Sequence, residues 1–111
     1  MALRSLTLGT TLLVIMLGGT GLTAGHAAAE PSALGHDLYQ RLSCHGCHTL
    51  QGRGGEVGPV LDGVGSRLSL EKLKTQLLTP HQRRTDSRMP SFAFVRPWEL
   101  QELLDFLQSL K

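Results

Sequence analysis

The stretch SCHGCHTL, residues 43–50, contains both cysteines of the 111-residue chain. Cys44 and Cys47 are three residues apart, and His48 follows the second cysteine directly. Side chains at this spacing on one helical turn point the same way, so both thiols can reach one edge of a flat ring system. The two cysteines and the histidine therefore form one local group of candidate ligands.

Three common uses of a C-x-x-C pair fit this chain poorly. A disulfide between Cys44 and Cys47 would close a very small loop and would constrain little of the unfolded chain. A thioredoxin-like redox pair needs a βαβ context, and no strand-rich pattern surrounds these cysteines. A structural zinc site needs four ligands, and the chain contains no second cysteine pair.

The five-residue pattern C-x-x-C-H is the attachment motif of c-type haem. Each cysteine forms a thioether with the porphyrin, and the following histidine is placed to bind the iron. The sequence therefore predicts one covalently attached haem c, held by Cys44 and Cys47, with His48 as the proximal iron ligand.

Met89 is the predicted distal ligand of the iron. It is the only methionine after residue 29 and lies in the polar stretch DSRMPSF, away from any helical apolar stripe. A thioether is a neutral, soft donor that favours ferrous iron and raises the reduction potential. The alternatives are a core methionine that fills a gap, an open sixth position, or a histidine ligand. The candidate histidines are His36, His45 and His81.

Residues 1–29 are predicted to be an export signal. Arg4 is the only charged residue before Glu30, and the intervening segment is first apolar, then rich in Gly, Thr and Ala, and ends in A-x-A. This is the order of a secretory signal with its cleavage site. The alternative is a retained membrane anchor, because the uncharged run is long enough to cross a bilayer. In both cases residues 30–111 are expected on the periplasmic side, since positive charge keeps the N-terminus inside.

Residues 30–111 are predicted to form a single small domain with nearly balanced charge. They contain all nine Asp and Glu residues and, because Arg4 lies outside, ten of the eleven Lys and Arg residues, for a net charge of +1. This excludes nucleic-acid binding, which needs a basic field. A domain this small usually needs a disulfide, a metal or a cofactor to complete its core. We therefore expect the haem to lie at the centre of the core.

Hydrophobic periodicity predicts an all-α domain with three main helices and long loops. The first helix starts with Ser32 as its N-cap, the second covers residues 69–79 with Ser69 as its N-cap, and the third has Pro97 at its first position. Residues 52–65 and 80–96 are predicted to be irregular loops packed around the haem. Leucines on the three helices form the predicted buried stripes. They are Leu34, Leu38 and Leu42, then Leu70, Leu73 and Leu77, then Leu100, Leu103, Leu104, Leu107 and Leu110, with Trp98 and Phe106 beside the last stripe.

Residues 30–111 resemble class I cytochromes c, in particular the short bacterial ones. The resemblance is carried by GHDLYQRLSCHGCHTL, then GPVLDGVGSR, then RMPSF, and then the leucine-rich helix that ends in LDFLQSL. It implies a small cytochrome c fold whose three main helices and long loops wrap around one haem. It also implies that the first and last helices cross where Gly35 and Tyr39 meet Phe106.

Two further roles are implied by this resemblance. The carbonyl of Pro59 would accept a hydrogen bond from the ring N–H of His48, which orients the ligand and strengthens its donation to iron. Arg67 would lie near a haem propionate, although a solvated surface arginine is an equal alternative.

The predicted function is that of a periplasmic monohaem cytochrome which carries single electrons between redox proteins and is not an enzyme. One alternative is a haem subunit of a membrane oxidoreductase, with membrane contact only if residues 1–29 are retained. Another is a haem enzyme or gas sensor with an open sixth position on the iron. Arginines near Met89 could steer an acidic partner, or they could be ordinary solvated charges. They are Arg83, Arg84, Arg88 and Arg96.

Overall fold

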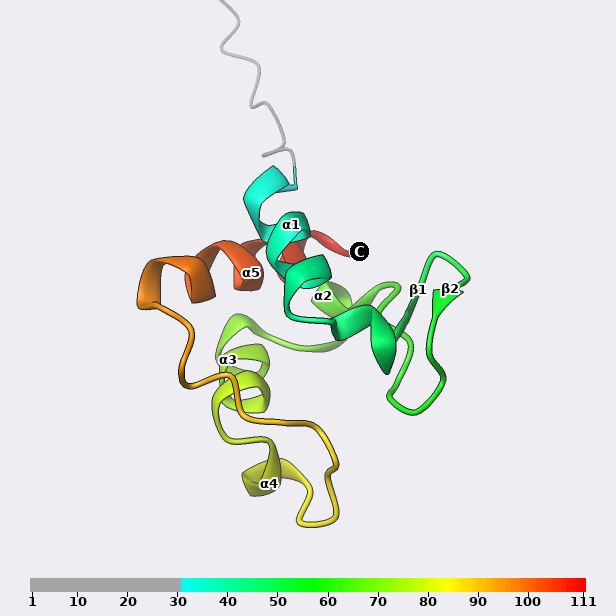
Figure 1. Ribbon diagram of the computed structural model, residues 1–111, viewed down its shortest axis with the longest axis vertical. Coiled ribbons are helices and arrows are strands. Elements are labelled where there is room, and N and C mark those ends of the chain that lie inside the picture. Colours follow the sequence, from blue (N-terminus) through cyan, green and yellow to red (C-terminus); the bar gives the residue numbers. More distant parts are fainter. Residues whose placement is uncertain (1–30) are drawn as a thin grey trace, which may run out of the picture.

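The computed structural model describes residues 31–111, and the predicted export signal lies outside the described residues (Figure 1). The order of elements is α1 (Ala33–Arg41), the 3-10 turn η1 (Cys44–Gly46), β1 (Thr49–Leu50), β2 (Arg53–Gly54), α2 (Val64–Arg67), α3 (Leu70–Leu78), α4 (Pro80–Arg83) and α5 (Pro97–Ser109). Helices α1, α2 and α3 all contact α5, so α5 is the centre of the packing. In Figure 1, α1 crosses α5, and the β1–β2 hairpin lies on the side away from α3 and α4.

The start of α1 is tied to α5 through its N-cap. The Ser32 hydroxyl accepts a hydrogen bond from the backbone N–H of Gly35 at 3.0 Å, as predicted for an N-cap serine. The same hydroxyl donates to the carboxylate of Glu102 on α5. One side chain therefore both begins the helix and joins it to its packing partner.

Helices α1 and α5 cross at Gly35, as the family resemblance implied. A Cβ atom at Gly35 would lie 2.5 Å from Cβ of Phe106 and would also overlap the backbone carbonyl of Glu102. The rings of Tyr39 and Phe106 pack beside this point with centroids 5.8 Å apart. The absence of a side chain at Gly35 is what allows the two helices to approach this closely.

Leucines of α3 and α5 form the rest of the core. Leu73 and Leu77 of α3 are buried, and Leu103 and Leu104 of α5 are almost completely inaccessible to solvent. The prediction that Leu70 is buried was wrong, because its exposed fraction is 37%. Leu70 is the first residue of α3 and lies at the end of the stripe, where the helix has no further turn to cover it. Trp98 is also half exposed and packs beneath the guanidinium of Arg96, 4.5 Å from the ring centroid.

Short regular elements occur in both segments that were predicted to be irregular. Strands β1 and β2 pair antiparallel through a two-residue turn, Gln51 and Gly52, in which both residues have positive φ. This is the turn geometry that matches the twist of a hairpin. Helices α2 and α4 have four residues each, and Pro80 both ends α3 and occupies the first turn of α4. Two-residue strands and single-turn helices are too short to produce a periodic signal in the sequence.

An ion pair at the start of α5 predicts a pH-dependent contribution to stability. Arg96 donates to both carboxylate oxygens of Glu99, at 2.7 and 3.0 Å, and these bonds hold the pKa of Glu99 below its usual value. We expect Glu99→Gln to lower the free energy of unfolding at neutral pH. The deficit should shrink as the pH falls through the folded-state pKa of Glu99, because the wild type then loses the same charge. Thermal unfolding of the wild type and the variant between pH 7 and pH 3 measures this difference in stability.

Glu71→Gln is the matched control for this prediction. Glu71 also lies in the first turn of its helix, so the substitution removes a similar interaction with the helix dipole. It removes no ion pair among residues 31–111. If the free energy of unfolding changed with pH in the same way for both variants, the ion pair between Arg96 and Glu99 would contribute nothing specific to stability.

Candidate haem-binding site

The two cysteines lie on a compact turn between α1 and β1. The backbone N–H groups of Cys47 and His48 both donate to the carbonyl of Cys44, at 3.2 and 3.0 Å. Ser43 enters the turn with a left-handed backbone conformation. Both thiols are free, with Cys44 partly buried and Cys47 exposed, and burial raises the pKa of Cys44 to about 11. The turn therefore presents two free thiols from one short segment.

The ring of His48 is held by the loop that follows the hairpin. Its Nδ1 atom lies 2.7 Å from the carbonyl oxygen of Pro59, so that nitrogen carries the proton and donates it. A Cβ atom at Gly58 would lie 2.5 Å from Cε1 and 2.7 Å from Nδ1 of the ring, which shows that the loop backbone rests against the imidazole. This arrangement leaves Nε2 as the nitrogen with a free lone pair.

Glycines let residues 54–61 pack against the attachment turn. The N–H of Gly55 donates to the backbone carbonyl of His45 at 2.9 Å, and the N–H of Gly58 donates to the backbone carbonyl of Cys47 at 2.7 Å. At Gly54, where φ is 117°, and at Gly55, a Cβ atom would collide with backbone atoms of the turn. The glycine-rich composition therefore reflects close backbone contact rather than a flexible linker.

Arg67 contacts loop carbonyls in this structure. Its guanidinium donates to the carbonyl oxygens of Val60, at 2.7 Å, and Asp62. The carboxylate of Asp62 in turn accepts the N–H of Gln51 at 3.1 Å. Arg67 is exposed, and it thus ties α2 to the loop that carries Pro59.

Met89 lies on a separate segment that is anchored to α3. It is partly buried against the hydrophobic core, and its sulfur accepts a hydrogen bond from Nε2 of Gln76 at 3.5 Å. The Ser91 hydroxyl donates to the carbonyl of Leu78 at 2.6 Å, and the N–H of Phe92 donates to Leu77 at 2.8 Å. The backbone on the C-terminal side of Met89 is therefore fixed against the C-terminal end of α3.

The structure brings some of the predicted site residues together and places Met89 on a different segment of the chain. Cys44, Cys47, His48 and Pro59 form one contiguous group, whereas Met89 belongs to the segment between α4 and α5, yellow to orange in Figure 1. The alternative ligands His36, His45 and His81 are exposed. Sequence reasoning did not identify Gln76, because a single helical glutamine carries no pattern that would distinguish it. It also gave no role to Gly58, whose position next to Pro59 was the available signal.

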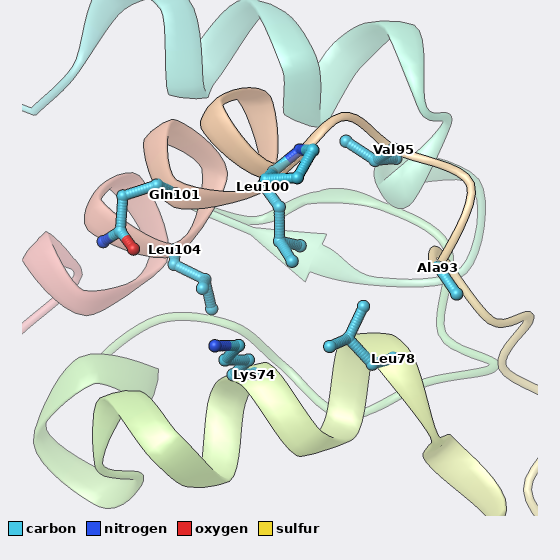
Figure 2. Close-up of a pocket in the computed structure, with 8 residues that line it drawn as sticks. Lys74, Leu78, Ala93, Val95, Leu100, Gln101 and Leu104 are labelled. Atoms are coloured by element: carbon cyan, nitrogen blue, oxygen red, sulfur yellow. The ribbon is translucent and has the colours of Figure 1, made fainter.

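A surface groove of about 310 Å³ lies between α3 and α5 (Figure 2). Its lining includes the apolar side chains of Leu78, Leu100 and Leu104 and the polar side chains of Lys74 and Gln101. A second, more open groove of about 400 Å³ is lined by Glu71, Lys72, Thr75 and Arg83. Neither groove includes a candidate haem ligand, so the candidate site rests on the geometry of the attachment turn.

The residues around the attachment turn fit a covalently bound haem. Two free thiols lie one turn apart, and the adjacent imidazole has one nitrogen committed to a carbonyl and the other free. The exposed fractions of Val57 and Val60 are 71% and 51%, so the loop next to His48 presents apolar surface of the kind that a porphyrin covers. Tyr39 Oη is the one buried side-chain N or O atom without a partner among residues 31–111.

Comparison with known proteins identifies the family. The family model described as Cytochrome c matches residues 32–111. The chain belongs to the cytochrome c family. The resemblance to class I c-type cytochromes is thereby confirmed, and membership of this family implies a covalently bound haem c with its iron.

Two similar proteins are subunits of cytochrome c oxidases. Cbb3-type cytochrome c oxidase subunit CcoP of Helicobacter pylori is 32% identical over 79 residues, covering 69% of this chain and 27% of the relative. Cytochrome c oxidase subunit 2 of Alkalihalophilus pseudofirmus is 26% identical over 85 residues, covering 69% of this chain and 25% of the relative. The chain thus spans about a quarter of the length of these relatives. No solved structure shows a significant match to it. Among residues 31–111, no helix is both long and apolar enough to cross a membrane.

Proposed function

We propose that this cytochrome is a periplasmic, monohaem electron carrier whose iron is bound by His48 and Met89. The observation that carries the proposal is the position of His48. Its ring follows two free thiols directly, its Nδ1 is bonded to Pro59, and its Nε2 is free to bind a metal. In ligating histidines generally, such a bond on the second nitrogen fixes the tautomer and the ring orientation.

The chain supplies attachment and orientation for this role. The bound haem supplies the chemistry, a one-electron change between ferric and ferrous iron. Cys44 and Cys47 fix the position of the ring, and the contacts of Gly58 and Pro59 limit rotation of the His48 imidazole. Because the protein holds its ligands in place, little rearrangement opposes electron transfer. No acid–base group is needed for this activity, so we propose a carrier rather than an enzyme.

Exposed arginines near the Met89 segment suit an encounter with an acidic redox partner. Arg83, Arg84 and Arg88 are exposed, and Arg84 also lies 3.5 Å from Asp86 in a surface ion pair. Charges of this kind raise association rates at low ionic strength more than they raise affinity. We propose redox proteins as the partners, reached after export directed by residues 1–29.

A second candidate function is that of a haem subunit in a membrane oxidoreductase. The similarity to subunits of two cytochrome c oxidases favours it. The N-terminus of the purified protein, determined by intact-mass spectrometry, separates the candidates. A start at Glu30 supports a soluble carrier, whereas retention of residues 1–29 together with recovery in the membrane fraction supports the subunit.

The proposed ligation is tested by Met89→Ala. Ferric wild-type protein should show the sulfur-to-iron charge-transfer band in the near red, and the ferrous protein should not bind carbon monoxide. The variant should lose the band, bind carbon monoxide readily, and have a lower reduction potential, because the thioether raises it. The expected fall is a substantial part of the roughly 0.8 V over which axial ligands set haem potentials.

Leu78→Ala is the control, since it shortens another partly buried side chain that packs on the core near α4. It should leave the near-red band unchanged. If wild-type protein already lacks the band and binds carbon monoxide, the sixth position is open. The enzyme or gas-sensor alternative would then replace the electron carrier.

A further inference from the structure

Two backbone hydrogen bonds attach the loop around Pro59 to the segment that follows the attachment turn. The N–H of Gly58 donates to the carbonyl of Cys47 at 2.7 Å, and the N–H of Leu61 donates to the carbonyl of Thr49 at 2.9 Å. Pro59 lies between these two bonds and has no N–H group of its own to contribute. The position of the Pro59 carbonyl therefore depends on its neighbours in the loop.

Asp62 adds a third attachment through its side chain. Both of its carboxylate oxygens lie 3.1 Å from the backbone nitrogen of Gln51, in the turn between β1 and β2. Gln51 has a φ of 51°, a conformation that costs energy for a residue with a side chain. A hydrogen bond to an ionised carboxylate is stronger than one between neutral groups, so it offsets part of this cost. The backbone carbonyl of Asp62 also accepts a hydrogen bond from Arg67, so this one residue joins the loop to the hairpin and to α2.

The position of the Pro59 carbonyl matters for the proximal ligand. The carbonyl accepts the Nδ1 proton of His48 at 2.7 Å, and a bond of this kind makes the other ring nitrogen a stronger donor. Ferric iron depends more on this donation than ferrous iron does, so the bond favours the ferric state. If the Asp62 carboxylate no longer held the hairpin turn, the loop beyond Leu61 would be free to shift, and the bond to His48 would weaken.

We propose that Asp62 is a positioning residue for His48, because its carboxylate fixes the loop on the β1–β2 hairpin and keeps the Pro59 carbonyl on Nδ1. The inference rests on the proposed ligation of iron by His48. It concerns a side chain to which neither the attachment motif nor the family resemblance gives a role. It follows from the contact between the hairpin turn and the loop, which lie 11 residues apart in the sequence.

Asp62→Ala tests the proposal, with Asp62→Asn as the matched control. Both variants lose the charge, whereas asparagine keeps an oxygen that can accept the Gln51 N–H. The readouts are the reduction potential and the rate at which the His48 Nδ1 proton exchanges with solvent, measured by NMR of the ferrous, haem-loaded protein. We expect severalfold faster exchange in Asp62→Ala than in Asp62→Asn. We also expect the redox equilibrium of Asp62→Ala to lie about threefold further toward ferrous, about 30 mV at 59 mV per tenfold.

Asp105→Ala is a second control, for the loss of an acidic side chain elsewhere on the surface. Asp105 is exposed on α5, and its carboxylate accepts a hydrogen bond from Gln101 of the same helix at 2.8 Å. The exchange rate of the His48 Nδ1 proton should equal that of the wild type in this variant. Asp62→Ser repeats the measurement should Asp62→Ala fail to fold, because the serine hydroxyl is one bond shorter in reach than the carboxylate.

The outcomes separate this inference from the proposed function. If the His48 ring of the wild type shows the large upfield shifts of an axial ligand, but Asp62→Ala matches Asp62→Asn in both readouts, Asp62 does not position His48. Equally fast exchange in both Asp62 variants and slow exchange in the wild type would also overturn the inference, since charge rather than the hydrogen bond would then be responsible. If the wild-type ring lacks these shifts, His48 does not bind the iron, and both proposals are overturned.

Discussion

Replacing Cys44 and Cys47 together by alanine is expected to abolish covalent haem attachment completely. The two thiols are the only sulfhydryl groups in the sequence, so no other residue can form a thioether. The variant should also lose the folded domain, because a chain of this size depends on its cofactor to complete the core. Expression with the haem-attachment machinery, followed by haem staining after denaturing electrophoresis, measures attachment. Circular dichroism measures the helix content.

Ser43→Ala is the control for the cysteine variant, because it alters the same turn and keeps both thiols. It should retain full haem staining. Single replacements add information, since either remaining thiol can hold the haem through one thioether. Haem staining in the double variant would show that the chain binds its cofactor by some other covalent route, and the attachment role of both cysteines would be wrong.

Gly35→Ala is expected to destabilise the protein through the crossing of α1 and α5. The added Cβ atom would meet Cβ of Phe106 at 2.5 Å and the backbone of Glu102 more closely still. Overpacking usually costs about 1–3 kcal/mol, and the upper part of this range applies because a backbone atom cannot rotate away. This exceeds the roughly 1 kcal/mol by which alanine is favoured over glycine inside a helix. Urea unfolding of the haem-loaded protein gives the free energy.

Gly46→Ala is the matched control for the helix crossing. A Cβ atom at Gly46 meets no other atom within 4 Å, and the backbone there does not require positive φ. We therefore expect a change of less than about 0.5 kcal/mol, as for most surface substitutions. Equal stability of the two variants would mean that the helices separate without loss, and that Gly35 is not needed for their packing.

The helix starts show how much local chemistry could be predicted. The side chains of Ser32 and Ser69 each accept a hydrogen bond from the backbone N–H three residues further along the chain. Pro97 is the first residue of α5. These features depend on side chains within one turn of each other, so a few consecutive residues are enough to predict them. The hairpin and the single-turn helices were missed because two to four residues are too few to produce a periodic signal.

The candidate site divides in the same way. The site roles of Cys44, Cys47 and His48 could be predicted because the attachment motif is defined by residue spacing along one turn. The bond between His48 and Pro59 was implied by the family resemblance, and it is present in the structure. The loop contacts of Arg67 could not be predicted, since a guanidinium can pair with any carbonyl or carboxylate that the fold brings near it.

The sequence alone predicted the type of cofactor, the residues proposed to attach it, the family, and the main helices with their caps. Each of these depends on residue identity at short, regular spacing. Only the tertiary structure decided that Gly58 lies against the His48 ring and that Gln76 reaches the sulfur of Met89. These partners are 10 and 13 residues apart in the numbering, and they meet only after turns and helices have placed their segments side by side. Such contacts follow from packing, and a linear pattern does not record packing.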